Sequence, residues 1–279
     1  MPPVRTNTGS NRRKLDWRFV PNTGQLRRLH HHMVLVPWAL LAFGGACCAP
    51  AWTSGTSIVL LWDPKTMVIA ADSLTATNVP GTFLRTCKIH HAGTSVFAAA
   101  GLMTNQAVGY DILGIAGPVL RGTGTAGEKA VRIERAARRP LAAALSQLPE
   151  DVFREHHGRG SALQFVVASA QPGGPVFTAV LLGGVRTDAG GVEVAPAEVI
   201  SCPGQTCRSV IVLGETDAIS QFVKSNPRFE IPRSALQEVA TAFVILEIRS
   251  VPSKVGPPVD VIRIDQSGIG WLVKKPECD

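Results

Sequence analysis

Short apolar runs separated by turn-forming residues characterise the chain from residue 57 onward. The runs at 57–62 and 67–71 flank the segment Asp63-Pro64-Lys65-Thr66, whose second-position proline suits a type I turn. The pattern therefore predicts an antiparallel hairpin over 57–71.

The rest of the chain alternates between helical spacing and strand-like runs. Helical spacing of apolar residues predicts helices at 104–116, 127–148, 216–224 and 233–249. Runs broken by Gly and Pro predict further strands at 83–90, 95–101, 163–169, 176–183, 191–200, 209–213, 259–264 and 269–273. This order favours an α+β fold of two packed antiparallel sheets with outer helices over a parallel doubly wound sheet.

The positive charge of the chain is concentrated at its N-terminal end. The formal net charge is +7, yet residues 1–32 carry seven basic groups and one acidic group, and residues 33–55 carry none. The remaining 56–279 segment therefore has a net charge of only +1. We interpret 1–32 as a basic leader, and the domain itself gives no support to phosphate binding or a nucleic-acid partner.

Residues 33–51 begin with an apolar stretch that follows two arginines. The stretch is short for a membrane span, and Ala49-Pro50-Ala51 has the small residues of a signal-peptide cleavage site. The pattern predicts an export signal over 33–51, and hence a periplasmic or secreted mature protein without a stable membrane span. An uncleaved anchor, a buried helix and a start at Met33 stay open as alternatives, and a chain without a signal would be cytoplasmic.

Cysteine positions leave one pairing open and disfavour one kind of metal site. Of six cysteines, Cys47 and Cys48 fall in the predicted signal. Cys202 and Cys207 flank the turn-forming PGQT segment, which allows a disulfide in an oxidising compartment without requiring one. A zinc site is disfavoured because no second cysteine pair has ligand spacing.

The geometry of the first hairpin brings two chemically useful residues together. If its turn is centred between Pro64 and Lys65, Asp72 lies opposite Ser57, next to Thr56. A chain cut before Thr56 would carry a free threonine amine, whose pKa of about 7.7–8.0 allows it to take a proton from its own hydroxyl. One residue would then supply both nucleophile and base.

Three further residues would complete such a site. Gly55 can adopt the strained backbone in which the Thr56 hydroxyl attacks the preceding carbonyl. Lys88 would stabilise the developing alkoxide, with Asp72 fixing its charge and direction. Gly101, at a strand end, would present a backbone N–H to an oxyanion. Each residue alone has an ordinary structural explanation, so the prediction depends on their combination.

These segments resemble the proteasome β-subunit family of N-terminal nucleophile (Ntn) hydrolases. The resemblance rests on GTSIVLL at 55–61, VIAADS at 68–73, FAAAGL at 97–102, and Lys88. Sixteen residues separate Thr56 from Asp72, and sixteen separate Asp72 from Lys88, as in the nucleophile, aspartate and lysine of the family. The resemblance implies a four-layer αββα sandwich over 56–279, and a propeptide, 52–55, that is removed by self-cleavage after Gly55.

The family's supporting residues map less regularly onto this chain. Ser73 follows the aspartate as expected, but the basic residue that the family usually has next is Leu74 here. The serine that helps to hold the free amine falls at Glu215, with Thr216 as a substitute, and Ser253 is the candidate for the late serine.

The resemblance implies a threonine-type endopeptidase that hydrolyses peptides or unfolded proteins and assembles into a homo-oligomeric ring. Its mechanism requires neither a metal nor an organic cofactor. Two alternatives stay open: an amidase acting on small exported amides, and a non-catalytic structural subunit with the same fold.

Overall fold

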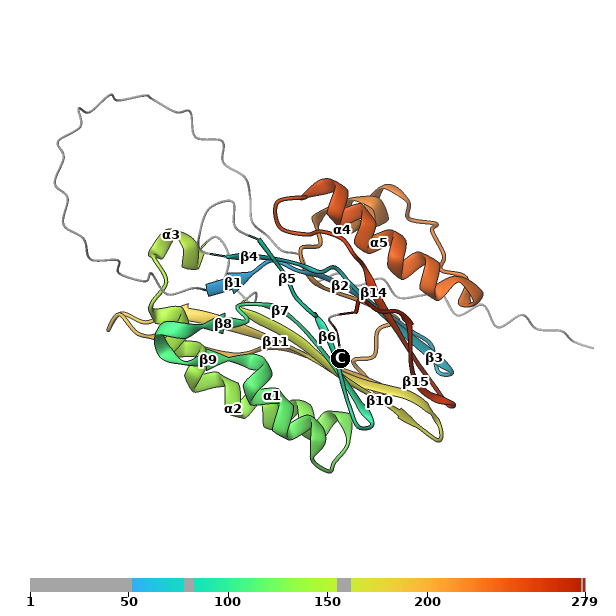
Figure 1. The fold of residues 1–279 in the computed structure, drawn as a ribbon, viewed down its shortest axis with the longest axis horizontal. Helices are drawn as coiled ribbons and strands as arrows, with labels where there is room; N and C mark the ends of the chain where they lie inside the picture. Colours follow the sequence, from blue (N-terminus) through green and yellow to red (C-terminus); the bar gives the residue numbers. More distant parts are fainter. Residues whose placement is uncertain (1–51, 78–82, 155–161, 277, 279) are drawn as a thin grey trace, which may run out of the picture.

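The computed structural model describes residues 52–77, 83–154, 162–276 and 278. The predicted leader, the predicted signal, and Cys47 and Cys48 within it lie outside the described residues. The described part has an α+β fold with antiparallel sheets and few helices (Figure 1). None of its helices is both long and apolar enough to cross a membrane.

The predicted first hairpin forms the centre of one five-stranded sheet. In spatial order its strands are β13 (Val210–Gly214), β2 (Ser57–Trp62), β3 (Thr66–Ala71), β14 (Asp260–Asp265) and β15 (Gly268–Val273). Ile58 pairs with Ala71, which confirms the predicted register. Because strand side chains alternate between faces, Ile58 and Leu60 face one apolar cluster while Val59 and Leu61 face another.

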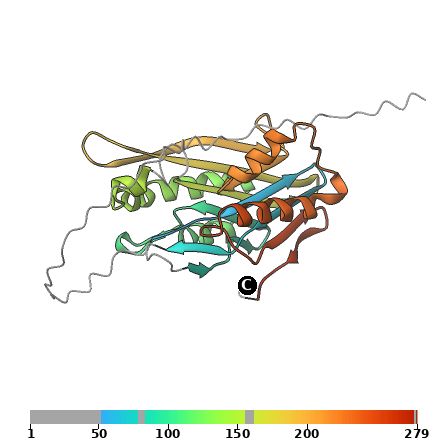
Figure 2. The ribbon, with the colours of Figure 1, turned by 90° about the horizontal axis from the view of Figure 1, so that it is seen from above.

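A second five-stranded sheet packs against the first. Its strands, in spatial order, are β12 (Val192–Cys202), β11 (Gly174–Arg186), β10 (Leu163–Gln171), β7 (Ser95–Gly101) and β6 (Ile89–Ala92). Buried residues from both sheets form one apolar cluster, which includes Leu60, Ile262, Ala98 and Val166. Figure 2 shows the β11–β12 hairpin extending beyond the rest of this sheet.

The longer helices pack on the faces of the two sheets that point away from that cluster. The helices α1 (Ile112–Arg121) and α2 (Ala126–Ser146) share a cluster with the second sheet. The helices α4 (Asp217–Ser225) and α5 (Leu236–Ser250) share another with the first sheet (Figures 1 and 2). Shorter helical turns are η1 (Gln106–Val108), α3 (Glu150–Val152) and η3 (Arg233–Ala235).

A third antiparallel sheet corrects the expectation of two. Its strands, in spatial order, are β5 (Phe83–Arg85), β4 (Leu74–Thr77), β1 (Trp52–Ser54), β8 (Thr104–Asn105) and β9 (Tyr110–Asp111). The central strand β1 is most of the segment 52–55 that the sequence predicts as a propeptide.

Two predicted elements are wrong in part. The helix predicted from residue 104 begins at Ile112, because Asn105 and Asp111 accept hydrogen bonds from backbone N–H groups two residues ahead and Gly109 is left-handed at φ 65°. The strand predicted over 83–90 divides into β5 and β6, and the interval between them contains Lys88.

Candidate active site

Thr56 stands at the junction of β1 and β2, in an uncut chain. It is 1% exposed, and its carbonyl oxygen accepts a hydrogen bond from the Glu215 N–H at 2.8 Å. A Cβ on Gly214 would lie 1.9 Å from that oxygen, so glycine is required for this close approach. The loop between β13 and α4 therefore fixes the backbone of Thr56.

Asp72 lies where the hairpin register predicts it, at the end of β3. One carboxylate oxygen, Oδ1, accepts the N–H of Ser57 at 2.9 Å. The other, Oδ2, accepts the N–H of Leu74 at 2.9 Å and that of Gly256 at 3.1 Å. These backbone donors hold the buried carboxylate in one orientation beside the start of β2.

Lys88 reaches the same point from the segment before β6. Its Nζ donates to the carbonyl oxygens of Gly55 at 2.6 Å and Leu74 at 2.7 Å, and to Thr56 Oγ1 at 2.5 Å. An ammonium has three protons, so all of its donors are engaged. Nζ also lies 3.8 Å from Asp72 Oδ1, which makes a buried ion pair. The structure thus brings Thr56, Asp72 and Lys88 together around the predicted cleavage point.

Burial changes the proton affinity of both charged groups. Desolvation raises the pKa of the Asp72 carboxyl, against the opposing effects of Lys88 and three backbone N–H donors. Desolvation lowers the pKa of Lys88 to about 8; Asp72 opposes this shift, and the nearby Lys275 adds to it. Lys88 therefore changes its charge near neutral pH, in a range useful for acid–base chemistry.

A hydroxyl group and an ammonium group both contact the carbonyl oxygen of the Gly55–Thr56 peptide bond. The Thr56 hydroxyl donates to the Gly55 carbonyl oxygen, and Lys88 donates to that oxygen as well. Gly55 has φ +92°, a left-handed conformation, and a Cβ there would lie 2.8 Å from the Lys254 carbonyl oxygen. The arrangement places the hydroxyl beside the carbonyl, and a cation on the oxygen that would become negative if the hydroxyl attacked the carbonyl carbon.

We expect Gly55→Ala to slow self-cleavage by at least about tenfold, because its methyl group clashes with the Lys254 carbonyl and moves the Gly55 carbonyl out of line. Intact mass spectrometry of the purified chain over time measures the uncut fraction. Gly93→Ala is the matched control, because Gly93 is also left-handed at φ +59° but a Cβ there meets nothing within 4 Å. Equal cleavage of both variants would contradict the assignment.

Gly101, Thr216 and Glu215 are the remaining predicted residues on the elements around Thr56. Gly101 ends β7 with φ +100°, and a Cβ on Gly214 would lie 3.2 Å from the Cβ of the preceding Ala100. The oxyanion role of Gly101 stays a prediction. Thr216 is buried at the start of α4. Glu215 Oε1 pairs with Lys254 Nζ at 3.3 Å, at the edge of the site.

Two supporting candidates do not join the buried group around Thr56. Ser73 donates to the Pro258 carbonyl oxygen at 2.6 Å and accepts from Lys275, so its hydroxyl belongs to a neighbouring network. Ser253 is exposed in the turn after α5. The same turn contributes backbone instead: the Lys254 carbonyl against Gly55 and the Gly256 N–H to Asp72.

Sequence reasoning missed a disulfide beside the site. Cys87, which precedes Lys88, is bonded to Cys278, with 5.5 Å between the Cα atoms. Cys202 and Cys207 form the disulfide that their spacing allows. Once that pair is made, the two cysteines left between residues 56 and 279 are Cys87 and Cys278, and this count was the available signal.

Comparisons with known proteins bear on the fold. No family model and no curated protein matches the sequence. Among solved structures, Anbu (ancestral beta-subunit) from Yersinia bercovieri is similar, with a TM-score of 0.51 and 14% identity over 78% of this chain and 88% of that chain. Anbu from Hyphomicrobium sp. strain MC1 has a TM-score of 0.44 and 15% identity over 79% of this chain and 89% of that one.

These findings correct the family suggested by the motifs. Assignment to the proteasome β-subunit family has no support from a family model or a curated relative, and the two similar structures named above are Anbu proteins, from a proteasome-related but distinct family. At 14% identity the likeness to the Yersinia protein shows the fold alone. Function must therefore be argued from the site.

Proposed function

We propose that this protein is a threonine-type Ntn hydrolase that cuts its own chain between Gly55 and Thr56 and then hydrolyses peptide bonds with the freed Thr56. The helices outside two packed sheets, and the likeness to Anbu, support the finer expectation of a four-layer αββα sandwich. The buried group of Thr56, Asp72 and Lys88 supports the chemistry.

Self-cleavage follows from the contacts around Gly55. Thr56 Oγ1 attacks the Gly55 carbonyl carbon, and the charge that develops on the carbonyl oxygen is stabilised by Lys88 Nζ at 2.6 Å. The Gly55–Thr56 C–N bond breaks as the hydroxyl proton passes to the threonine nitrogen, which leaves an ester. Water then hydrolyses the ester, giving a Gly55 carboxylate and a free Thr56 amine and hydroxyl.

The position of β1 is the observation that favours a peptide substrate over a small amide. This strand pairs on one edge with β4, where Ser54 lies opposite Ala76, and on the other with β8, where Thr53 lies opposite Thr104. Once the bond after Gly55 is cut and β1 departs, a space the width of one strand opens between two strand edges and leads to Thr56. An extended peptide can satisfy both edges with ladder hydrogen bonds, whereas a small amide cannot.

In the mature protein the Thr56 amine would take the hydroxyl proton as the oxygen attacks the substrate carbonyl. Lys88 and Asp72 would then stabilise the alkoxide and hold its direction. Gly101 remains the proposed backbone donor to the oxyanion, and no step needs a metal or an organic cofactor.

A panel of extended peptide reporters and small acyl-amides tests the proposal on the purified, self-cleaved protein. The matched controls are the same peptides N-methylated at two amides, which removes two ladder donors. We expect the peptides to be hydrolysed, and N-methylation to lower kcat/KM by about tenfold, since each hydrogen bond contributes about 0.5–1.5 kcal/mol. Thr56→Ala must abolish turnover.

Two results of this experiment would favour another function over the proposed one. Turnover of acyl-amides together with indifference to N-methylation would favour the small-amide amidase. A correctly cut protein that hydrolyses neither substrate class and is not labelled by a threonine-directed electrophile would favour the non-catalytic subunit.

We also propose where the protein is located and how it assembles. The disulfides Cys87–Cys278 and Cys202–Cys207 support an exported protein, because such bonds persist in oxidising compartments. The homo-oligomeric ring stays a prediction, which size-exclusion chromatography with light scattering would test.

A further inference from the structure

A second buried lysine, Lys275, lies in the tail that follows β15. Its side chain is 4% exposed, and its Nζ lies 2.8 Å from Asp260 Oδ2. Nζ also donates to the Thr86 carbonyl oxygen at 2.8 Å and to Ser73 Oγ. The backbone N–H of Lys275 donates to Asp260 Oδ1 at 2.9 Å. Burying an ammonium is costly unless it is paired and hydrogen-bonded, so its position is firmly specified.

The contacts of Lys275 join the two segments that carry the charged partners of Thr56. Ser73 directly follows Asp72, and Thr86 precedes Lys88 by two residues. The Thr86 N–H also donates to the Ser73 carbonyl oxygen at 2.9 Å. Lys275 thus joins the two chain segments that carry Asp72 and Lys88, and its hydrogen bonds do not include Thr56.

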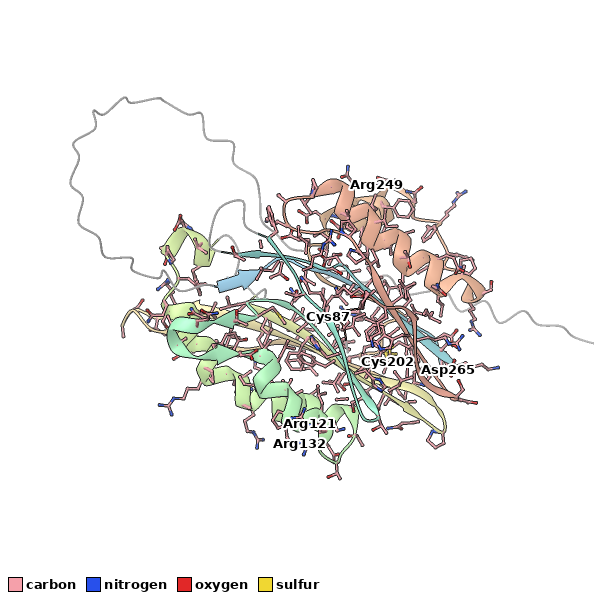
Figure 3. The ribbon with its side chains drawn as sticks, viewed as in Figure 1. Cys87, Arg121, Arg132, Cys202, Arg249 and Asp265 are labelled. Atoms are coloured by element: carbon pink, nitrogen blue, oxygen red, sulfur yellow. A yellow bond between two sulfur atoms is a disulfide. The ribbon has the colours of Figure 1, made fainter. Side chains whose placement is uncertain are left out.

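The Cys87–Cys278 disulfide fixes the tail at this place. It joins residues 191 apart in sequence, and Cys87 is the immediate neighbour of Lys88. The Cys278 N–H donates to the Lys275 carbonyl oxygen at 3.1 Å, so a single turn links the crosslink to the buried lysine. Cys87 and Cys202, labelled in Figure 3, occupy separate positions and belong to separate disulfides.

We propose that Lys275, clamped by the Cys87–Cys278 disulfide, is a positioning residue for the Thr56 site, and that reduction of this disulfide slows the chemistry there. The inference rests on the proposed function. Reduction by a dithiol delivers two electrons and two protons, giving two cysteine thiols and an oxidised dithiol. The tail can then move away from the site, and the hydrogen bonds from Lys275 to Ser73 and Thr86 are lost.

The charge of Lys275 gives the proposed positioning role a measurable consequence, which is a shift in the pKa of Lys88. The ionisable groups that act on Lys88 are Asp72, which raises its pKa, and Lys275, which lowers it; Asp260 is paired with Lys275. Removing the Lys275 ammonium from this place therefore raises the pKa of Lys88. A purely structural crosslink elsewhere in the fold would leave that pKa unchanged.

The first measurement is kcat/KM on a peptide reporter, with and without a dithiol, for the self-cleaved wild type, Cys87→Ser/Cys278→Ser and Cys202→Ser/Cys207→Ser. We expect dithiol and the first double variant to lower kcat/KM by about tenfold, since small displacements of catalytic groups have effects of this size or larger. The second double variant should match the oxidised wild type and stay sensitive to dithiol. Equal rates for the two double variants would overturn the proposal.

The second measurement does not depend on catalysis. A lysine ¹³Cε NMR titration of the full-length Thr56→Ala protein reports the pKa of Lys88, assigned by comparison with Thr56→Ala/Lys88→Met. Reduction, or Lys275→Met, should raise this pKa, and Lys275→Arg should restore the lower value. If Lys275→Met fails to fold, Lys275→Met/Asp260→Asn replaces it, because that pair leaves no buried charge unpaired.

The two measurements separate the inference from the proposed function. A Lys88 pKa that is the same in the oxidised, reduced and Lys275→Met proteins would overturn the positioning role even in an active peptidase. A pKa that rises as expected, in a protein that cleaves neither itself nor any peptide, would uphold Lys275 and refute the proposed function.

Discussion

Thr56→Ala is expected to leave the chain uncut after Gly55, whereas the wild type should begin at Thr56. The side-chain hydroxyl is the only group of residue 56 that can attack the preceding carbonyl, and alanine has no substitute for it. The difference in mass between the two purified proteins includes the whole segment that precedes Thr56, which intact mass spectrometry resolves easily. N-terminal sequencing of the wild type identifies the new terminus directly.

The matched control for this change is Thr56→Ser. Serine keeps the hydroxyl that donates to the Gly55 carbonyl oxygen, so we expect it to cleave where alanine does not. A folded wild type that stays uncut, or an alanine variant that is still cut after Gly55, would refute the assignment of Thr56.

Lys88→Met is expected to slow self-cleavage by about 10²–10³-fold, the usual effect of removing one donor to a developing oxyanion. Methionine has a similar length but no proton to donate to the Gly55 carbonyl oxygen. Cell-free synthesis of the precursor, followed by sampling for intact mass at fixed times, measures the rate constant. Lys224→Met is the control, because Lys224 is exposed in α4. Equal rates for the two variants would contradict the role of Lys88.

Lys88 also predicts how stability depends on pH, separately from any activity. Its pKa of about 8 in the folded protein is below the ordinary value of 10.5, so the unfolded chain binds more protons between these two values. The free energy of unfolding therefore gains a contribution that rises with pH from about 8 to 10.5. Urea unfolding of Thr56→Ala and of Thr56→Ala/Lys88→Met across this range should show the rise in the first protein and its loss in the second.

The parts of the fold that sequence predicts well are those set by local patterns. The hairpin register followed from two apolar runs and one proline turn, and the observed pairing of Ile58 with Ala71 confirms it. The helix predicted over 104–116 was wrong over 104–111, because local caps at Asn105 and Asp111 outweigh apolar spacing in so short a segment. The strand predicted over 83–90 was wrong over 86–88, because the pattern cannot show that Lys88 turns into the interior.

The family assignment failed for a different reason. Motif spacing concerns only three residues, Thr56, Asp72 and Lys88, and does not by itself specify a family. The overall likeness to Anbu is a property of the whole arrangement of strands and helices, which the motifs did not contain.

By itself, the sequence determined the juxtaposition of Thr56 and Asp72, because the position of the proline turn between the two apolar runs sets the register of the hairpin. Tertiary structure alone decided the long-range contacts that hold these residues in place. Gly256 reaches Asp72 across 184 residues, and Lys275 reaches Ser73 across 202. Contacts over such separations arise from the packing of whole sheets, and neither periodicity nor spacing encodes them. The strand β1, between two edges beside Thr56, likewise exists only once β4 and β8 are in place.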